Sequence, residues 1–173
     1  MTVDLSRNLD RGGDAHGDTY AAVENLNGFR HDDHLTGTND ANRLYSFDGD
    51  DVVMRLGGDD SLAGEAGDDT TDGGTGDDTL DGVRGDNDLT GGPGYDIVVA
   101  DFAPGDTVVR DFDPGEDRIH FYGESYETFM ARAVQDGADV VYQRGNTYLG
   151  YETSLRIGNT TLAALTPDVM LFD

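Results

Sequence analysis

The sequence predicts an all-β fold: a parallel β-roll of nine-residue repeats with a C-terminal β-sandwich-like cap. Three observations predict it. An apolar position recurs every nine residues from Leu26 to Val98, glycine columns keep register with it, and aromatic residues replace the glycines from about residue 97. The expected organisation is a lead-in of strands over residues 1–24, the β-roll over 25–98 and the β-rich cap over 99–173.

The chain is strongly acidic. It has 36 acidic and 11 basic residues, all of the latter Arg, for a net charge of -25. Such self-repulsion destabilises a compact chain unless counter-ions neutralise it. It also argues against nucleic acid and anionic membranes as partners, because both bind basic surfaces.

Other classes are excluded by what the sequence lacks. There is no cysteine, so disulfides and thiolate metal sites are absent. No apolar run is long enough to predict a membrane span, and the N-terminus lacks the pattern of a signal peptide. Acidic, glycine-rich sequence is also typical of disorder, but the periodicity favours a fold.

Three columns define the repeat. The apolar column is Leu26, Leu35, Leu44, Val53, Leu62, Thr71, Leu80, Leu89 and Val98. Two positions before it stands a carboxylate or amide column: Glu24, Asp33, Asn42, Asp51, Asp60, Asp69, Asp78, Asn87 and Asp96. Glycine recurs four positions before and two positions after the apolar residue, and chance does not hold several columns in register over so many steps.

The spacing matches the nonapeptide G-G-x-G-x-D-x-U-x, a Ca²⁺-binding parallel β-helix repeat. Residues 73–80 and 91–98 fit it at every defined position. The first six residues of each repeat predict a turn, in which glycine tolerates positive φ and lets carbonyls approach an ion. The last three predict a strand with its apolar residue inward, and two repeats complete a coil that stacks about 4.8 Å from the next.

This geometry predicts where calcium binds. Alternate turns stack, so one edge carries Asp33, Asp51, Asp69 and Asn87, and the other carries Asn42, Asp60, Asp78 and Asp96. A Ca²⁺ between two stacked turns can take a carboxylate from each and complete its shell with turn carbonyls. The candidate carbonyl ligands are those of Gly49, Gly58, Gly67, Gly74, Gly76, Gly85, Gly92 and Gly94.

The number of aspartates at each site predicts how strongly it binds calcium. We expect the best ones at Asp51 with Asp69, Asp60 with Asp78, and Asp78 with Asp96. Sites that use Asn42 or Asn87 lose one ligand charge and should be weaker. Stacked pairs under these coordination rules predict several ions, roughly three to six.

Some positions depart from the repeat. Ser46-Phe47 and Arg55-Leu56 replace opening glycine pairs, and Thr71 is polar in the inward column. His31 stands at a glycine position, so strain there is expected to weaken a site at Asp33. A second acidic column should face solvent and raise the local calcium concentration: Asp32, Asp50, Asp59, Asp68, Asp77 and Asp86.

The C-terminal part predicts short strands over residues 97–100, 107–112, 118–122, 139–143, 147–151 and 154–157, with one helix over 126–134. Its aromatic residues are expected to form a core that covers the open end of the roll, because solenoids need capped ends. Asp111, Asp113, Glu116 and Asp117 do not fit the EF-hand spacing, so a turn is predicted there, with a further calcium left open.

These features resemble a known family. Residues 25–98 are similar to the repeats-in-toxin (RTX) arrays of Gram-negative secreted proteins. The stretch from Val3-Asp4-Leu5 through Gly12-Gly13-Asp14 to Asp18-Thr19 resembles the lead-in of such arrays, and residues 111–119 resemble the D-F-x-x-G-x-D-x-I step that follows them.

The resemblance implies a secreted, extracellular protein that leaves the cell unfolded through a type I secretion apparatus and folds on meeting calcium. Residues 168–173 are similar to the uncleaved C-terminal export signals, although a terminal β-strand explains them equally well. The start at Met1, directly before a lead-in strand, suggests a piece of a longer protein.

Catalysis is not expected. None of the four histidines forms an H-E-x-x-H motif, and there is no G-x-S-x-G elbow. The leading hypothesis is therefore a non-catalytic calcium-binding module. The alternative is a polysaccharide-binding module for an alginate-like polyanion, using Arg110, Arg118, Arg132, Arg144 and Arg156; a stand-alone enzyme ranks third.

Overall fold

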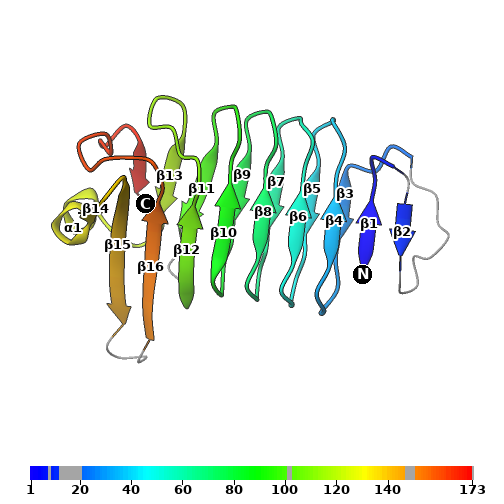
Figure 1. Ribbon diagram of the computed structural model, residues 1–173, viewed down its shortest axis with the longest axis horizontal. Coiled ribbons are helices and arrows are strands. Elements are labelled where there is room, and N and C mark those ends of the chain that lie inside the picture. The colour runs from blue at the N-terminus through cyan, green and yellow to red at the C-terminus, as the bar shows by residue number, and fades with distance from the viewer. Residues whose placement is uncertain (8, 12–20, 101–102, 147–150, 173) are drawn as a thin grey trace.

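The computed structural model describes residues 1–7, 9–11, 21–100, 103–146 and 151–172. Over these residues the chain is a solenoid of two facing sheets, connected by turns that stack along both edges (Figure 1). The predicted parallel β-roll is confirmed.

One sheet has ten strands in the order β14-β15-β16-β12-β10-β8-β6-β4-β1-β2, and the other has seven in the order β17-β13-β11-β9-β7-β5-β3. The strands that precede and form the roll are β1 (Thr2–Asp4), β2 (Leu9–Arg11), β3 (Asn25–Asn27), β4 (His34–Thr36), β5 (Arg43–Tyr45), β6 (Val52–Met54), β7 (Ser61–Ala63), β8 (Thr70–Asp72), β9 (Thr79–Asp81), β10 (Asn87–Thr90) and β11 (Ile97–Ala100). The elements that follow are β12 (Gly105–Val109), β13 (Arg118–Phe121), α1 (Tyr126–Arg132), β14 (Val134–Asp136), β15 (Asp139–Asn146), β16 (Tyr151–Ile157) and β17 (Met170–Phe172).

The register follows the nine-residue period. Strand β6 pairs in parallel with β8, which stacks Val53 on Thr71, and β7 pairs with β9, which stacks Leu62 on Leu80. The apolar column thus forms the interior of the roll, and all its members except half-buried Leu26 are buried. Because alternate strand residues point to opposite faces, only one residue per three-residue strand reaches this interior.

The roll runs without a break into the C-terminal part. Strand β12 adds to β10, β13 adds to β11, and β16 and β17 then add to β12 and β13, all in parallel. Strands β15 and β14 close the larger sheet as antiparallel neighbours. The predicted β-rich end is therefore present, and its strands belong to the same two sheets as the roll.

Aromatic residues form the core of this end, as expected. Phe121 stacks on Phe172 with ring centroids 5.1 Å apart, and Phe129 of α1 stacks on Tyr142 at 4.9 Å. Phe121, Phe129 and Tyr142 are fully buried. Helix α1 begins at the N-cap Ser125, whose hydroxyl accepts a hydrogen bond from the Thr128 backbone N–H. It ends at Arg132, slightly earlier than predicted.

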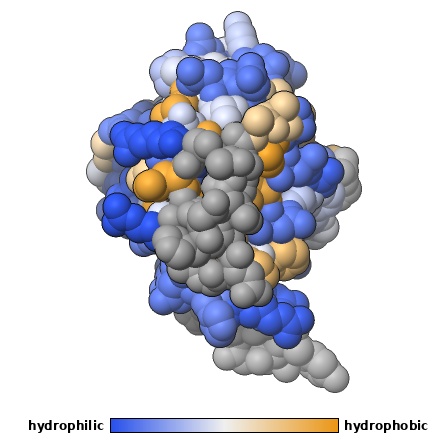
Figure 2. Space-filling view, turned by 90° about the vertical axis from the view of Figure 1, so that its right-hand side faces the viewer, coloured by the Kyte–Doolittle hydropathy of each residue, from blue (hydrophilic) through white to orange (hydrophobic). Residues whose placement is uncertain are grey.

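The opposite end carries β1, which pairs in parallel with β4, and β2, which pairs with β1 in the antiparallel sense. Hydrophilic residues cover much of the surface visible from this side (Figure 2). The lead-in residues Gly12, Gly13, Asp14, Asp18 and Thr19, and most of the strand predicted at 147–151, lie outside the described residues. Within the described ranges no helix is long and apolar enough to cross a membrane.

Candidate metal centre

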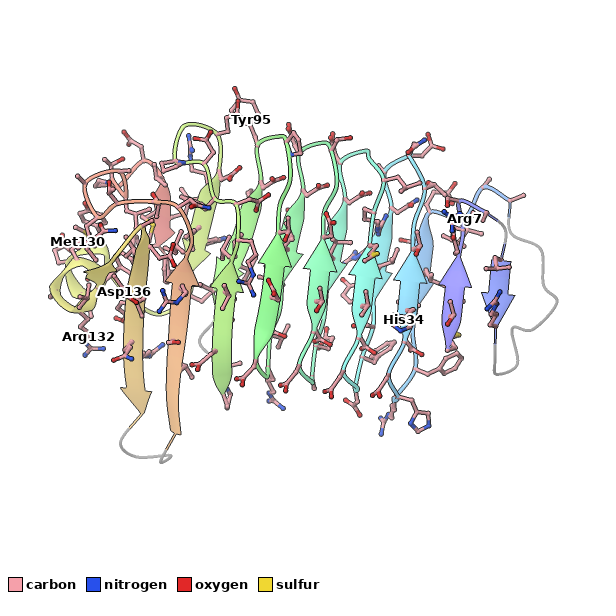
Figure 3. All side chains as sticks on the ribbon, in the orientation of Figure 1. Arg7, His34, Tyr95, Met130, Arg132 and Asp136 are labelled. Carbon is pink, nitrogen blue, oxygen red and sulfur yellow. The ribbon has the colours of Figure 1, made fainter. Side chains whose placement is uncertain are left out.

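The six-residue turns stack into two edges. The first edge consists of residues 28–33, 46–51, 64–69 and 82–87, and the second of 37–42, 55–60, 73–78 and 91–96. Backbone hydrogen bonds join neighbouring turns, as from Gly49 N–H to the Ala66 carbonyl at 2.9 Å and from Gly58 N–H to the Thr75 carbonyl at 2.9 Å. Oxygen-tipped side chains gather along both edges (Figure 3).

The residues at the last position of the turns are buried and stack into one hydrogen-bonded ladder on each edge. We call these two ladders together the inner ladder. Asp51 N–H donates to Asp69 Oδ1 at 2.9 Å, Asp60 N–H to Asp78 Oδ1 at 2.8 Å, and Asp78 N–H to Asp96 Oδ1 at 2.9 Å. The structure thus brings together the three carboxylate pairs that the sequence ranked first. The other predicted side chains, Asp33, Asn42 and Asn87, lie buried in the same two ladders.

The second oxygen of these carboxylates is left without a partner. The Oδ2 atoms of Asp51, Asp60, Asp69, Asp78 and Asp96 are buried and accept no hydrogen bond. An unpaired buried polar atom costs roughly 1–3 kcal/mol, and more when it is charged. A row of cations bound along each edge would give these five oxygen atoms the partners that they lack.

The opening glycines keep space beside these oxygens. A Cβ atom on Gly73 would lie 2.5 Å from Asp78 Oδ2, and one on Gly64 would lie even closer to Asp69 Oδ2. Real Cβ atoms do not approach so closely, so a side chain here would displace the carboxylate. In the turns that open with glycine, the cradle beside the carboxylate thus requires a residue without a side chain.

Glycine at the fourth position of six turns lets the backbone carbonyls of neighbouring coils lie close together. Gly67 has φ +144°, and a Cβ on it would lie 2.5 Å from the Gly49 carbonyl carbon of the preceding coil. The same close approach recurs along both edges. The eight glycines whose carbonyl oxygens were predicted to bind Ca²⁺ all have positive φ: Gly49, Gly58, Gly67, Gly74, Gly76, Gly85, Gly92 and Gly94.

Burial and like charge make the inner ladder electrostatically costly without metal. Burial raises the pKa of Asp69 to about 7, with further increases from the Asp51, Asp50 and Asp68 charges. Burial also raises the pKa of Asp78 to about 7 and that of Asp96 to about 6. Protons or metal cations can each neutralise these groups, because both bind the same carboxylate oxygens.

The reason predicted for a poor Asp33 site is wrong. His31 does not have positive φ, so it bears no left-handed strain. It lies in the first turn of its edge. Within the turns of the first edge, the non-glycine residues with positive φ stand at the second position instead: Phe47 at φ +76°, Glu65 at +73° and Val83 at +62°.

The first turn of each edge nevertheless differs from the rest. Asp33 Oδ2 accepts a hydrogen bond from Phe29 N–H at 2.6 Å, and its Oδ1 contacts the amino group of Met1. Asn42 Oδ1 likewise accepts from Thr38 N–H at 2.9 Å. These oxygens are satisfied within the protein, unlike the five unpaired Oδ2 atoms.

The second acidic column faces solvent, as predicted, but it also makes contacts that sequence reasoning missed. Asp32 Oδ1 accepts from Asp50 N–H at 3.1 Å, Asp50 Oδ1 from Asp68 N–H at 3.0 Å, and Asp59 Oδ1 from Asp77 N–H at 3.0 Å. We call these contacts the outer ladder. Its side chains accept from the turn 18 residues later, whereas those of the inner ladder accept from the turn 18 residues earlier. The acids that concentrate cations therefore also join adjacent coils.

Asp117 was also missed as a ladder residue. Its Oδ1 accepts from Asp96 N–H at 3.1 Å and its Oδ2 from Asp113 N–H at 2.7 Å, so it continues the second edge beyond the roll. The available signal was Asp117-Arg118-Ile119, which repeats the D-x-U pattern with Ile119 stacked on Val98. Because both its oxygens are satisfied, Asp117 lacks the unpaired atom that the five aspartates share.

No side-chain cluster alone makes a metal centre. In the described part of the chain no three His, Cys, Asp or Glu side chains converge to hold an ion. Any site here must combine one or two carboxylates with backbone carbonyls, which suits calcium better than zinc.

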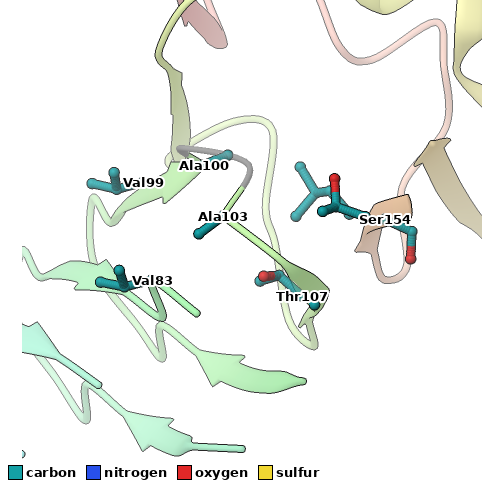
Figure 4. Close-up of a pocket in the computed structure, with 9 residues that line it drawn as sticks. Val83, Val99, Ala100, Ala103, Thr107 and Ser154 are labelled. Atoms are coloured by element: carbon teal, nitrogen blue, oxygen red, sulfur yellow. The ribbon is translucent and has the colours of Figure 1, made fainter. Parts of the chain in front are cut away.

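A small cavity lies where the roll meets the cap, lined in part by Val83, Val99, Ala103, Thr107 and Ser154 (Figure 4). Its volume is about 20 Å³, enough for roughly one water molecule. It offers no room for a substrate.

Comparison with known proteins agrees with the repeat. The family model described as RTX calcium-binding nonapeptide repeat (4 copies) matches residues 27–62, 56–80 and 63–98. No curated protein matches the chain.

Three solved structures are similar over most of this chain. The extracellular lipase LipA from Serratia marcescens has 15% identity and a TM-score of 0.41 over 90% of this chain, which spans only 41% of the lipase. Two subunits of a mannuronan C5-epimerase from Azotobacter vinelandii also match. AlgE6R2 has 23% identity and a TM-score of 0.41, over 80% of this chain and 91% of its own. AlgE6R3 has 26% identity and a TM-score of 0.40, over 90% and 86%.

Proposed function

Because residues 27–98 are an array of RTX calcium-binding nonapeptide repeats, we propose that this chain is a module that folds when Ca²⁺ neutralises its inner ladders. We further propose that it is the C-terminal part of a larger secreted protein and has no catalytic role of its own. The observation that carries the calcium proposal is the set of five buried, unpaired aspartate Oδ2 atoms.

The residues that fit calcium follow from these oxygens. Asp51 and Asp69 would supply carboxylate ligands on the first edge, and Asp60, Asp78 and Asp96 on the second. The remaining oxygens would come from turn carbonyls of the eight left-handed glycines, because Ca²⁺ takes six to eight oxygen ligands. Asp33, Asn42 and Asn87 would contribute less, since their oxygens already have partners or carry no charge.

The bound ion would supply positive charge and nothing redox-active. Without it, the raised pKa values of Asp69, Asp78 and Asp96 show that the fold disfavours their ionised forms. Binding free energy is then folding free energy. Low cytosolic calcium would keep the chain unfolded for a type I secretion apparatus, and calcium outside the cell would fold it.

A calcium titration tests the proposal. We expect far-UV circular dichroism to show a cooperative coil-to-β transition at high micromolar to millimolar Ca²⁺, and no transition with Mg²⁺, which demands tighter octahedral geometry. Asp78→Asn should move the midpoint to higher calcium, because Asp78 belongs to two of the predicted pairs. A chain already fully folded in chelator would contradict calcium-driven folding.

The polysaccharide alternative gains no support from the arginines. Arg110 pairs with Asp88 at 2.5 Å, Arg156 with Asp136 at 2.8 Å, and Arg144 with Glu124 at 3.2 Å. Arg132 also lies near Glu124, and Arg118 donates to the carbonyls of Glu116 and Asp117. Carboxylates thus compensate four of the five positive charges that would bind a polyanion.

A further inference from the structure

We propose that the Arg55 guanidinium replaces a calcium ion between turns 37–42 and 55–60, so that this step of the second edge is joined without metal. The inference deepens the proposed function, on which it rests. It concerns a residue that departs from the repeat: Arg55 stands in the opening position, which is glycine in most turns.

The position of the side chain is the first observation. The Arg55 side chain is completely buried, and its Nη1 lies 3.1 Å from Asp60 Oδ1. A Cβ placed on Gly37 would lie 2.6 Å from Arg55 Cδ and 2.8 Å from Nη1, so the guanidinium reaches into the cradle of the preceding turn.

Comparison with other turns shows what the guanidinium displaces. A Cβ placed on Gly73 would meet the carbonyl oxygen of Gly91 at 2.6 Å, and one on Gly28 would meet that of Ser46 at 2.6 Å. In these two turns the cradle faces a carbonyl oxygen of the next coil. Beside Gly37 the Arg55 side chain takes that place, next to Asn42 Oδ1, and a Ca²⁺ there would be repelled by the guanidinium charge.

The local charges balance without metal. The turn at 37–42 ends in the neutral Asn42, and the turn at 55–60 ends in Asp60, so this step has one carboxylate and one guanidinium. The steps that end in Asp78 and Asp96 each have two carboxylates. Burial lowers the pKa of Arg55 only to about 10, with Asp60 and Asp78 opposing the decrease, so the group is charged at neutral pH.

Most of the hydrogen-bond donors of the Arg55 guanidinium are unpaired. Its Nε and Nη2 are buried without a hydrogen-bond partner. A single contact to Asp60 does not satisfy a planar group with five donors. This poor satisfaction is consistent with a cation held in a cradle shaped for a different ligand.

Calcium counting by equilibrium dialysis tests the proposal. We expect Asn42→Asp/Arg55→Gly to bind one more ion per chain than the wild type, because it restores both a carboxylate and an open cradle. Asn42→Asp alone should leave the count unchanged, since Arg55 would pair with the new carboxylate. Arg84→Gly is the matched control: it removes one exposed positive charge on the first edge and should not change the count.

The outcomes separate the two proposals. A wild type that binds no calcium would overturn the proposed function. A wild type that binds calcium, with a folded double variant that gains no ion, would overturn only the role of Arg55.

A measurement on the wild type covers the case in which the double variant does not fold. At saturating calcium, the Arg55 Nε–H should give an NMR signal protected from solvent exchange, assigned by its loss in Arg55→Lys. Rapid exchange of this proton would show that calcium has expelled the guanidinium, and would overturn the proposal.

Discussion

At the scale of single residues, the unpaired carboxylate oxygens make the metal-free fold sensitive to pH. The folded-state pKa values of Asp69 and Asp78 are raised to about 7, and that of Asp96 to about 6, mainly by burial. Groups with raised pKa bind more protons in the folded state, so they favour folding at low pH, and this contribution is lost as pH rises through the folded pKa.

We therefore predict that, in chelator, the chain has more β-structure at pH 5 than at pH 8. Circular dichroism across this range checks the prediction, with the main change expected between pH 6 and 7.5. Asp69→Asn/Asp78→Asn removes the two carboxyl groups whose pKa is raised to about 7 and should flatten the profile. Identical spectra at pH 5 and 8 for the wild type would contradict the burial argument.

A second residue-scale prediction concerns Thr71. This side chain takes an apolar position between Val53 and Leu89, and its Oγ1 is buried without a partner. Thr71→Val replaces the hydroxyl by a methyl group of similar size, so it should raise the free energy of unfolding by about 1–2 kcal/mol.

Urea unfolding at saturating calcium measures this change. Thr70→Val, on the exposed face of the same strand, is the control and should stay within about 0.5 kcal/mol of the wild type. A destabilised Thr71→Val would indicate that the hydroxyl has a partner when calcium is bound.

Residue-level prediction from sequence succeeded where a position belongs to a column. The inner-ladder aspartates could be assigned because a fixed period places them above one another. Arg55 was noticed only as a defect, since nothing in the sequence says whether a charged side chain at the opening position points into the turn or away from it. His31 was misjudged because a glycine position in the repeat does not by itself fix the backbone φ of the residue that replaces the glycine.

At the scale of the turn, glycine at the fourth position is required by two independent constraints. Gly67 combines φ +144° with a close approach to the Gly49 carbonyl. We predict that Gly67→Ala destabilises the calcium-bound protein by roughly 2–4 kcal/mol, because both the backbone conformation and the stacking distance must change.

The calcium midpoint and the thermal unfolding temperature both report this effect. Gly115→Ala is a suitable control, since Gly115 does not have positive φ and its nearest neighbour is a side-chain oxygen of Asp113 at 3.1 Å. Similar losses in the two variants would show that the stacked turns have room for a methyl group.

Element boundaries were predictable only while the period held. Strands of the roll fall where the nine-residue step places them. Beyond residue 98 the coils lengthen, so that Asp106 lies 20 residues after its ladder partner Asp86, and Asp117 lies 21 after Asp96. The strand expected at 107–112 accordingly occupies Gly105–Val109, and its pairing with β10 could not be inferred from spacing alone.

At the scale of the whole molecule, the two halves derive their stability from different sources. The roll buries one apolar side chain per repeat, which is little hydrophobic area for its length, and it holds a row of carboxylates that repel one another. The C-terminal end instead buries a cluster of aromatic side chains. The roll and the C-terminal end belong to the same two sheets. When one of them folds, its last strands can therefore hydrogen-bond with the first strands of the other.

This coupling gives the last prediction. Phe121 is fully buried and stacks on Phe172, while Phe129 lies 5.2 Å away, so Phe121→Ala should cost about 3–5 kcal/mol. If the cap and roll fold together, calcium must make up that loss through mass action, and the midpoint of the calcium transition should rise several-fold. The number of bound ions should not change, because Phe121 belongs to β13 and the aromatic core and not to the stacked turns.

Calcium titrations followed by circular dichroism, with dialysis to count ions, distinguish this from independent folding. Tyr122→Ala removes the exposed aromatic neighbour and should leave the midpoint nearly unchanged. An unshifted midpoint in Phe121→Ala would mean that the roll folds on calcium alone, and that the cap contributes only its own stability. A raised midpoint with the same ion count would mean that the aromatic core helps to set the calcium concentration at which the whole chain folds.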